Sequence, residues 1–224
     1  MPIVTPRALL RKNAITPGAR ACITDATLDD IREAFQYLEI TESTQSKHYT
    51  PLFVNTLGAS FSQLPQAVQF LHSQVDRATF YGTASVTCGV NLLSRIIAAL
   101  FSFPKAGTAI PVRVDMTCSE DREYWHRTFD GKSFCSVLTS SRPGHVKERF
   151  GPLTFEMQLT IVERSITMPM CKGWFLGVPM PRFLLPESEA REYEEDGLFH
   201  FDVALSTPLC GLLTRYTGCL VKDK

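Results

Sequence analysis

The stretch REYWHRTFDGKSFCSVL, residues 122–138, decides the fold class of this chain. Its centre, Asp130-Gly131, is a two-residue turn signal between segments in which apolar and polar residues alternate, and this combination predicts a β-hairpin. The turn also sets the register of the two strands. The cross-strand pairs that follow are Arg127 with Phe134, Trp125 with Ser136, and Glu123 with Leu138.

Alternation with a period of two continues on both sides of this hairpin. The other strand-like segments are residues 79–88, 110–118, 153–161, 166–176, 198–205 and 212–221. Short turns join most of them, so the order of elements differs from an alternating βαβ pattern. We therefore predict an α+β fold built on a strongly curved antiparallel β-sheet, or partly closed barrel, of seven or more strands.

Helical spacing of apolar residues occurs in residues 27–38, 62–73 and 91–103. The third segment, NLLSRIIAALFSF, has a wide apolar stripe, and we expect this helix to cross one end of the sheet or lie on its concave face. Residues 178–197 are rich in proline and then acidic, which indicates a solvated loop or short helix that could form a lid. The predicted organisation is an N-terminal extension over residues 1–56 with one short helix, followed by a single β-rich domain over residues 57–224.

Composition excludes several classes of function. The chain has 224 residues with 23 Lys and Arg against 23 Asp and Glu, and zero net charge argues against binding along a nucleic-acid backbone. It has no apolar run long enough for a transmembrane helix. Its seven cysteines are odd in number and include no CxxC, so we expect neither a zinc site nor a disulfide framework. The N-terminal residues lack the apolar core of a secretory signal, and we expect a cytoplasmic protein, with organelle import as the alternative.

Glu123, Trp125, Arg127 and Phe129 are spaced by two and share one face of a strand. The two aromatic residues indicate that this face is covered, so the two charges lie in or beside an apolar layer. Glu123 and Arg127 are about 13 Å apart along a strand, too far to pair directly. In one interpretation Arg127 forms a structural bridge with Glu148 or Asp202. In the other, Arg127 anchors a carboxylate or enolate while Glu123 acts as the acid or base.

Further candidate binding residues surround this pair. Trp125, Phe129, Phe134 and Phe155 would supply aromatic walls, and Gly151-Pro152 forms a bend that aims Glu148. Arg182 lies in the predicted lid. His200 and Asp202 share one strand face, either as a His-Asp pair or as part of a solvated outer surface. Because GxGxxG, GxxxxGK[ST], HExxH and GxSxG motifs are absent from the sequence, no cofactor and no metal is predicted.

Most of the chain resembles an uncharacterised bacterial domain family that is often fused to the C-terminal side of saccharopine dehydrogenase-like or short-chain reductases. The resemblance covers about residues 57–221 and rests on the runs LGASFSQLPQAVQFLH, FYGTASV, LFSFPKAGTAIPVRV, REYWHRTFDGKSFCS, KERFGPLTFEMQL, LGVPMPRFLLPESEAREYEEDGLFHFDVAL and PLCGLLTRYTG. It implies no activity. The chain departs from the family where a basic residue is usual near Thr87-Cys88-Gly89 and where Cys219 replaces an aromatic residue.

Three functions remain open from the sequence. The leading hypothesis is a cavity protein that holds a small apolar, polyketide- or terpenoid-like molecule, extending to a cofactor-free isomerase, cyclase or dehydratase of secondary metabolism. The alternative is a non-catalytic interaction module that docks on a reductase. A structural or lipid-surface role is disfavoured, since the net charge is zero and no basic amphipathic helix is evident.

Overall fold

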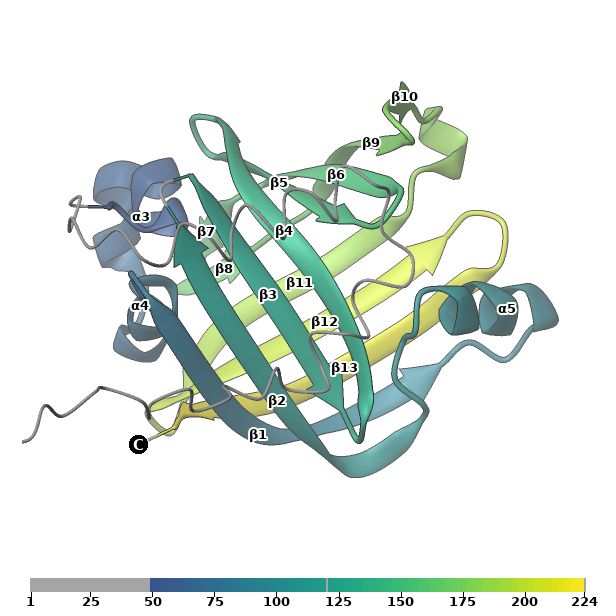
Figure 1. The fold of residues 1–224 in the computed structure, drawn as a ribbon, viewed down its shortest axis with the longest axis horizontal. Helices are drawn as coiled ribbons and strands as arrows, with labels where there is room; N and C mark the ends of the chain where they lie inside the picture. Colours follow the sequence, from purple (N-terminus) through teal and green to yellow (C-terminus); the bar gives the residue numbers. More distant parts are fainter. Residues whose placement is uncertain (1–48, 120, 224) are drawn as a thin grey trace, which may run out of the picture.

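The computed structural model describes residues 49–119 and 121–223. Their strands form one curved antiparallel sheet that does not close into a barrel (Figure 1), as predicted. In spatial order the strands are β10 (Val178–Pro179), β9 (Met170–Phe175), β6 (Leu153–Gln158), β5 (His145–Phe150), β4 (Lys132–Arg142), β3 (Arg122–Phe129), β2 (Gly107–Ser119), β1 (Arg77–Cys88), β13 (Gly211–Lys222), β12 (Leu198–Thr207), β11 (Glu187–Glu195), β8 (Ser165–Thr167) and β7 (Thr160–Val162). The two terminal strands are short: β10 has two residues, and β7, like its neighbour β8, has three.

The β3–β4 hairpin has the predicted register. Arg127 pairs with Phe134, Trp125 with Ser136, and Glu123 with Leu138. Its turn residues Asp130 and Gly131 have φ values of 45° and 78°, which is the conformation that a two-residue hairpin turn requires. The register places Glu123 and Arg127 on the same face as the core residues Trp125 and Phe129.

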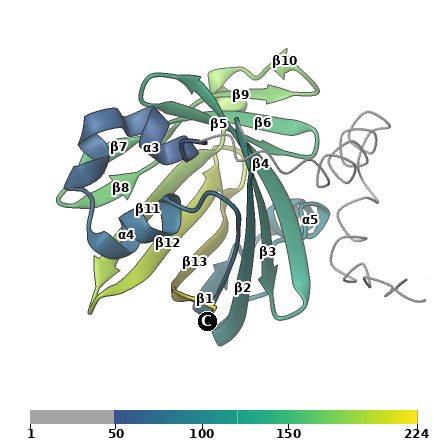
Figure 2. The ribbon, with the colours of Figure 1, turned by 60° about the vertical axis from the view of Figure 1, so that its left-hand side comes forward.

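One end of the curved sheet is covered by helices α3 (Leu52–Leu57) and α4 (Gln66–His72), joined by the 3₁₀ helix η1 (Gly58–Gln63) (Figure 2). Leu52 and Phe53, which the sequence analysis assigns to the N-terminal extension, pack in the core. The helix predicted over residues 62–73 is present as the shorter α4, which begins directly after Pro65. The helix predicted over residues 27–38 lies outside the described residues. We call the end under α3 and α4 the closed end.

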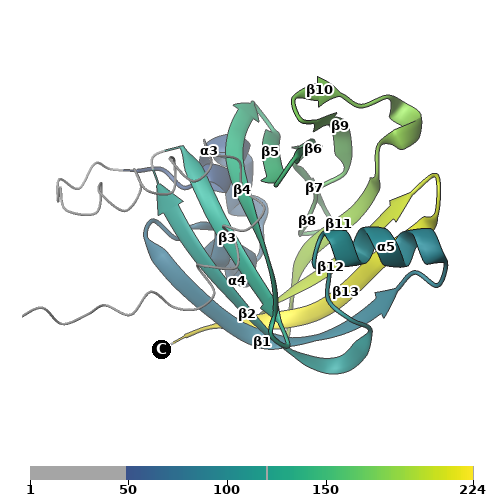
Figure 3. The same ribbon diagram turned by 45° about the vertical axis from the view of Figure 1, so that its right-hand side comes forward.

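Helix α5 (Leu92–Leu100) lies at the opposite end (Figures 1 and 3), which we call the mouth. The Asn91 side chain caps it, since its Oδ1 accepts a hydrogen bond of 2.7 Å from the Ser94 backbone N–H. The helix is present where the sequence predicts it and crosses the end of the sheet. Ser94 is its only buried residue, so most of its apolar stripe is not packed against the sheet.

The acidic segment predicted as a solvated loop or short helix is instead strand β11, so that part of the prediction is wrong. Ala190, Glu192 and Glu194 point to the inner face, while Glu189 and Arg191 point outward. Because charged residues occupy both faces, the period of two does not stand out in the sequence. The preceding segment contains β10 and the 3₁₀ helix η2 (Arg182–Leu184), with Arg182 exposed near the mouth.

Candidate functional site

The concave face of the sheet carries both charged residues that the sequence places there. Glu123 is 1% exposed and lies beside the buried Trp125, while the Arg127 side chain is 16% exposed. The two groups lie on one strand, β3, with Trp125 between them. Ionisable groups therefore occupy the apolar side of this sheet, where each needs a partner.

Glu123 has two hydrogen-bond donors at the closed end. The indole Nε1–H of Trp125 donates to its Oε2 at 3.0 Å, and the Leu52 backbone N–H donates to its Oε1 at 3.2 Å. Burial raises the pKa of Glu123, although His72 and the Trp125 hydrogen bond oppose this shift. Since α3 covers this carboxyl group, Glu123 is sealed from solvent.

His72 and Glu192 form a second buried contact beside Glu123, and the sequence analysis missed both. The His72 Nε2 lies 2.5 Å from the Glu192 Oε2, and the imidazole stacks on Phe53 with ring centroids 3.8 Å apart. Within the described residues, His72 Nδ1 has no hydrogen-bond partner. The position of His72 four residues after buried Val68 could have signalled that it shares the inward helix face.

Arg127 forms a compact polar group with Ser136 and Glu148. Its guanidinium donates to the Ser136 Oγ at 2.7 Å and to the Glu148 Oε1 at 3.2 Å, while the Ser136 hydroxyl donates to the same Glu148 oxygen at 2.6 Å. The guanidinium carbon lies 4.7 Å from the centre of the Trp125 ring and 5.8 Å from that of Phe134. Of the two bridges considered from the sequence, the structure contains the one to Glu148.

Tyr216 of β13 borders this polar group, and it was also missed. Its ring makes edge contacts with Phe129 and Phe201, at centroid distances of 5.4 and 6.1 Å. Burial raises the pKa of Tyr216 to about 12, against an opposing influence of Arg127. Its phenol is therefore a neutral hydrogen-bond donor near pH 7.

A few inward side chains of β12 and β13 are less buried toward the mouth, although Thr214 there is 0% exposed. On β12 and β13, Phe199, Phe201 and Leu220 are buried near the closed end. Val203, Leu205 and Tyr216, which also point inward, are only half-buried. Around Arg127 and Tyr216 the inner face is also largely buried, with Phe129, Phe134 and Thr214 at 3%, 8% and 0% exposure, while the Arg127 side chain keeps 16%.

The predicted binding residues divide into two groups. Trp125, Phe129, Phe134 and Phe155 lie on the inner face with Arg127 and Glu148, and Phe155 is the cross-strand partner of Glu148. His200 and Asp202 lie on the outer face instead. There the His200 ring stacks on Tyr193 at 5.4 Å and Asp202 pairs with Arg215, with a shortest N–O distance of 2.6 Å. The exposed Arg182 is not brought into contact with the inner group in the described structure.

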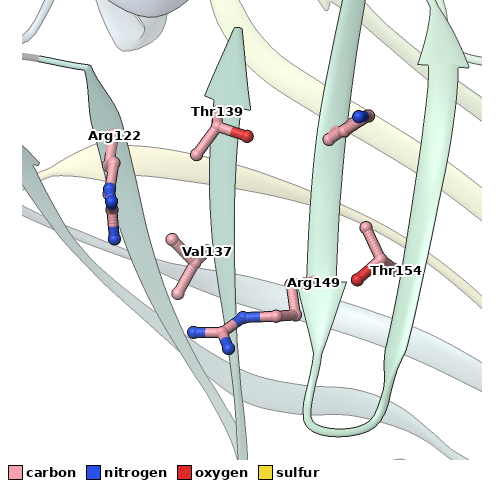
Figure 4. Close-up of a pocket in the computed structure, with 6 residues that line it drawn as sticks. Arg122, Val137, Thr139, Arg149 and Thr154 are labelled. Atoms are coloured by element: carbon pink, nitrogen blue, oxygen red, sulfur yellow. The ribbon is translucent and has the colours of Figure 1, made fainter. Parts of the chain in front are cut away.

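A pocket of about 300 Å³ lies on the outer face of strands β3 to β6 (Figure 4). It is lined by Arg122, Val137, Thr139, Lys147, Arg149 and Thr154. Figure 4 shows the Arg149 side chain extending toward Val137 on β4. Side chains alternate along these strands, so the sheet separates this pocket from Ser136 and Glu148.

The part of the chain that the structure describes also bears on metal binding and membrane insertion. In that part, no group of three or more His, Cys, Asp or Glu residues is placed to hold a metal ion. The same residues include no helix that is both long enough and apolar enough to cross a membrane.

A comparison with known protein families finds a match over most of the chain. A family model described as a domain of unknown function (DUF4166) matches residues 64–220, from just before helix α4 to Leu220 in strand β13. The chain belongs to this family. The DUF4166 match includes every inner-face residue described above except Leu52 and Phe53. No curated protein matches the chain.

Proposed function

We propose that this DUF4166 protein binds a small, mainly apolar molecule through a carboxylate or carbonyl oxygen. The observation that supports the proposal is the position of Arg127, a partly exposed cation on the apolar inner face of the sheet. Its contacts within the described residues use one N–H to Ser136 and one to Glu148, of the five that arginine carries. A guanidinium against aromatic rings is poorly solvated, so an anionic ligand group would gain more there than at the outer surface.

The surroundings of Arg127 agree with an apolar ligand body. Phe129 contacts both Phe134 and Tyr216, with ring centroids 5.9 and 5.4 Å apart, and Phe150 lies beside Phe134 at 6.4 Å. Tyr216 adds a neutral phenol that could donate to a ligand oxygen. A polyketide- or terpenoid-like acid or ketone has this combination of an apolar skeleton and one or two oxygen atoms.

The proposal extends to a cofactor-independent proton-transfer reaction such as an isomerisation. Glu148 would take a proton from a carbon beside the ligand carbonyl and return it to another carbon, while Arg127 and Tyr216 stabilise the enolate oxygen. We assign this role to Glu148 because Glu123 is sealed beneath α3. Glu123 is then a positioning residue that holds Trp125 against Arg127.

Binding of dodecanoate and of dodecanol, measured by displacement of a fluorescent apolar probe, tests the binding function. The wild-type protein should prefer the carboxylate by about tenfold, and Arg127→Met should remove this preference. Arg215→Met is the matched control, since Arg215 forms a similar carboxylate pair on the outer face. Equal binding of both compounds by the wild type, or an unchanged preference in Arg127→Met, would refute the proposal.

A further inference from the structure

Ten of the sixteen exposed large apolar side chains in the described residues lie at the mouth. Five of them, Val90, Leu92, Leu93, Ile96 and Leu100, belong to helix α5 and the residue preceding its cap. Leu92 and Leu100 are each 73% exposed. A nine-residue amphipathic helix with its apolar side in water is costly, which indicates that something covers it.

A second set of exposed apolar residues lies at the same end of the sheet. Phe175, Leu176, Val178 and Phe183 belong to the segment from β9 to η2. Figures 1 and 3 place this segment and α5 on the same side of the molecule, away from α3 and α4. Leu209 lies in the turn beside α5. We call these five residues and the five at α5 together the apolar rim.

The charges beside the apolar rim are mainly positive. The residue ranges that form the mouth are 90–107, 129–133, 150–153, 175–187 and 207–211. They contain the basic residues Arg95, Lys105, Lys132 and Arg182 and the acidic residues Asp130 and Glu187. Zero net charge over the whole chain therefore does not describe the mouth, where basic residues outnumber acidic ones four to two.

We propose that the apolar rim docks on the surface of a membrane that contains anionic lipid. The apolar side chains of α5 and of the β9–η2 segment would enter the boundary between headgroups and acyl chains, as an amphipathic helix does. Arg95, on the exposed helix itself, and the other three basic residues would contact anionic headgroups. The two apolar sets belong to separate elements at an open end of the sheet, and this basic border matches an anionic lipid surface. This proposal does not depend on a ligand at Arg127.

Co-sedimentation of the full chain with phosphatidylcholine vesicles, with and without 30% phosphatidylglycerol, tests the proposal. We expect binding about tenfold tighter to the anionic vesicles, and loss of this preference in 0.5 M NaCl. Substituting Leu92→Ser, Ile96→Ser and Leu100→Ser together should abolish sedimentation. If this variant does not fold, Val178→Ser with Phe183→Ser provides the same test at the second set. Arg127→Met should bind vesicles like the wild type, which separates this proposal from the ligand site.

The control combines Val75→Ser, Val162→Ser and Val221→Ser. These three valines lie outside the mouth and are each about half exposed. These substitutions should leave sedimentation unchanged. Absence of vesicle binding by the wild type, or equal binding by the α5 variant, would overturn the proposal. If the wild type does not bind vesicles, a lower melting temperature of the α5 variant would mean that this chain covers the rim, and dissociation of a dimer by the same substitutions would mean that a second copy covers it.

Discussion

The Nε2 atom of His72 lies 2.5 Å from Oε2 of Glu192, and this contact joins helix α4 to strand β11 across 120 positions of sequence. His72 is 1% exposed and Glu192 8%. Because both groups are buried, each depends on the other to satisfy its hydrogen-bonding capacity. The pair therefore fixes α4 over the closed end of the sheet and, through it, the burial of Glu123.

Glu192→Ala should destabilise the protein by about 3 kcal/mol, since it leaves a buried imidazole without its partner. Glu192→Gln should cost less, because its amide can still form a hydrogen bond with Nε2. Urea unfolding followed by tryptophan fluorescence measures both. Glu189→Ala, on the outer face of the same strand, should change the free energy of unfolding by less than about 0.5 kcal/mol. Equal losses in Glu192→Ala and Glu189→Ala would contradict a structural pair.

Stability should depend on pH through Glu123. Burial raises the pKa of this group in the folded state, so the folded protein binds the proton more tightly than the unfolded chain. Its stabilising contribution is complete below the unfolded pKa of about 4.3 and is lost as the pH rises through the folded pKa. Glu123→Gln cannot titrate. The difference in unfolding free energy, wild type minus Glu123→Gln, should thus fall as the pH rises above the unfolded pKa, and a constant difference would contradict burial of an ionisable Glu123.

Arg127 and Glu148 should be strongly coupled. Arg127→Met and Glu148→Leu should each lower the free energy of unfolding by about 3 kcal/mol, because each leaves one charge without its partner on an apolar surface. The double variant should recover about 2 kcal/mol of the summed loss. The matched cycle with Arg215→Met and Asp202→Leu, on the exposed outer face, should show little coupling. If the inner cycle is no more coupled than the outer one, solvent screens Arg127 and the proposed ligand anchor is weakened.

In the Asp130-Gly131 turn, substitution of Gly131 should destabilise the protein more than substitution of Asp130. Gly131 has a φ of 78°, so Gly131→Ala should destabilise the protein by about 1–2 kcal/mol. Asp130→Asn should be nearly neutral, since asparagine adopts positive φ readily. Thermal unfolding of the two variants provides the comparison. Equal melting temperatures would mean that the turn does not hold the register that aligns Arg127 with Ser136.

Much of the fold could be predicted because local signals agree with it. The β3–β4 hairpin follows from two turn residues and alternation, and α5 follows from Asn91 and a helical apolar stripe. Sequence spacing could not choose between Glu148 and Asp202 as the partner of Arg127. The sheet order decides it, because β5 lies two strands from β3 and Glu148 points inward, while Asp202 points outward on the distant β12.

Other features depend on tertiary contacts that a single sequence does not contain. Glu192 belongs to a run of acidic residues that resembles a solvated segment, and only its pairing with His72 accounts for its burial. The apolar stripe of α5 predicts that something covers this face and does not say what. The burial of the inner face around Arg127 likewise depends on how far the sheet curves, which no local pattern specifies.

The two terminal strands of the sheet bear on how the protein behaves at high concentration. β7 contains three residues, and β10 contains two, one of them Pro179. A sheet that does not close has two edge strands, and strands of other molecules can pair with them. An edge strand that is very short or contains a proline is a poor template for such pairing. The native protein should therefore resist fibril formation, and any self-association should occur through side chains at the mouth, not through backbone pairing at the margins.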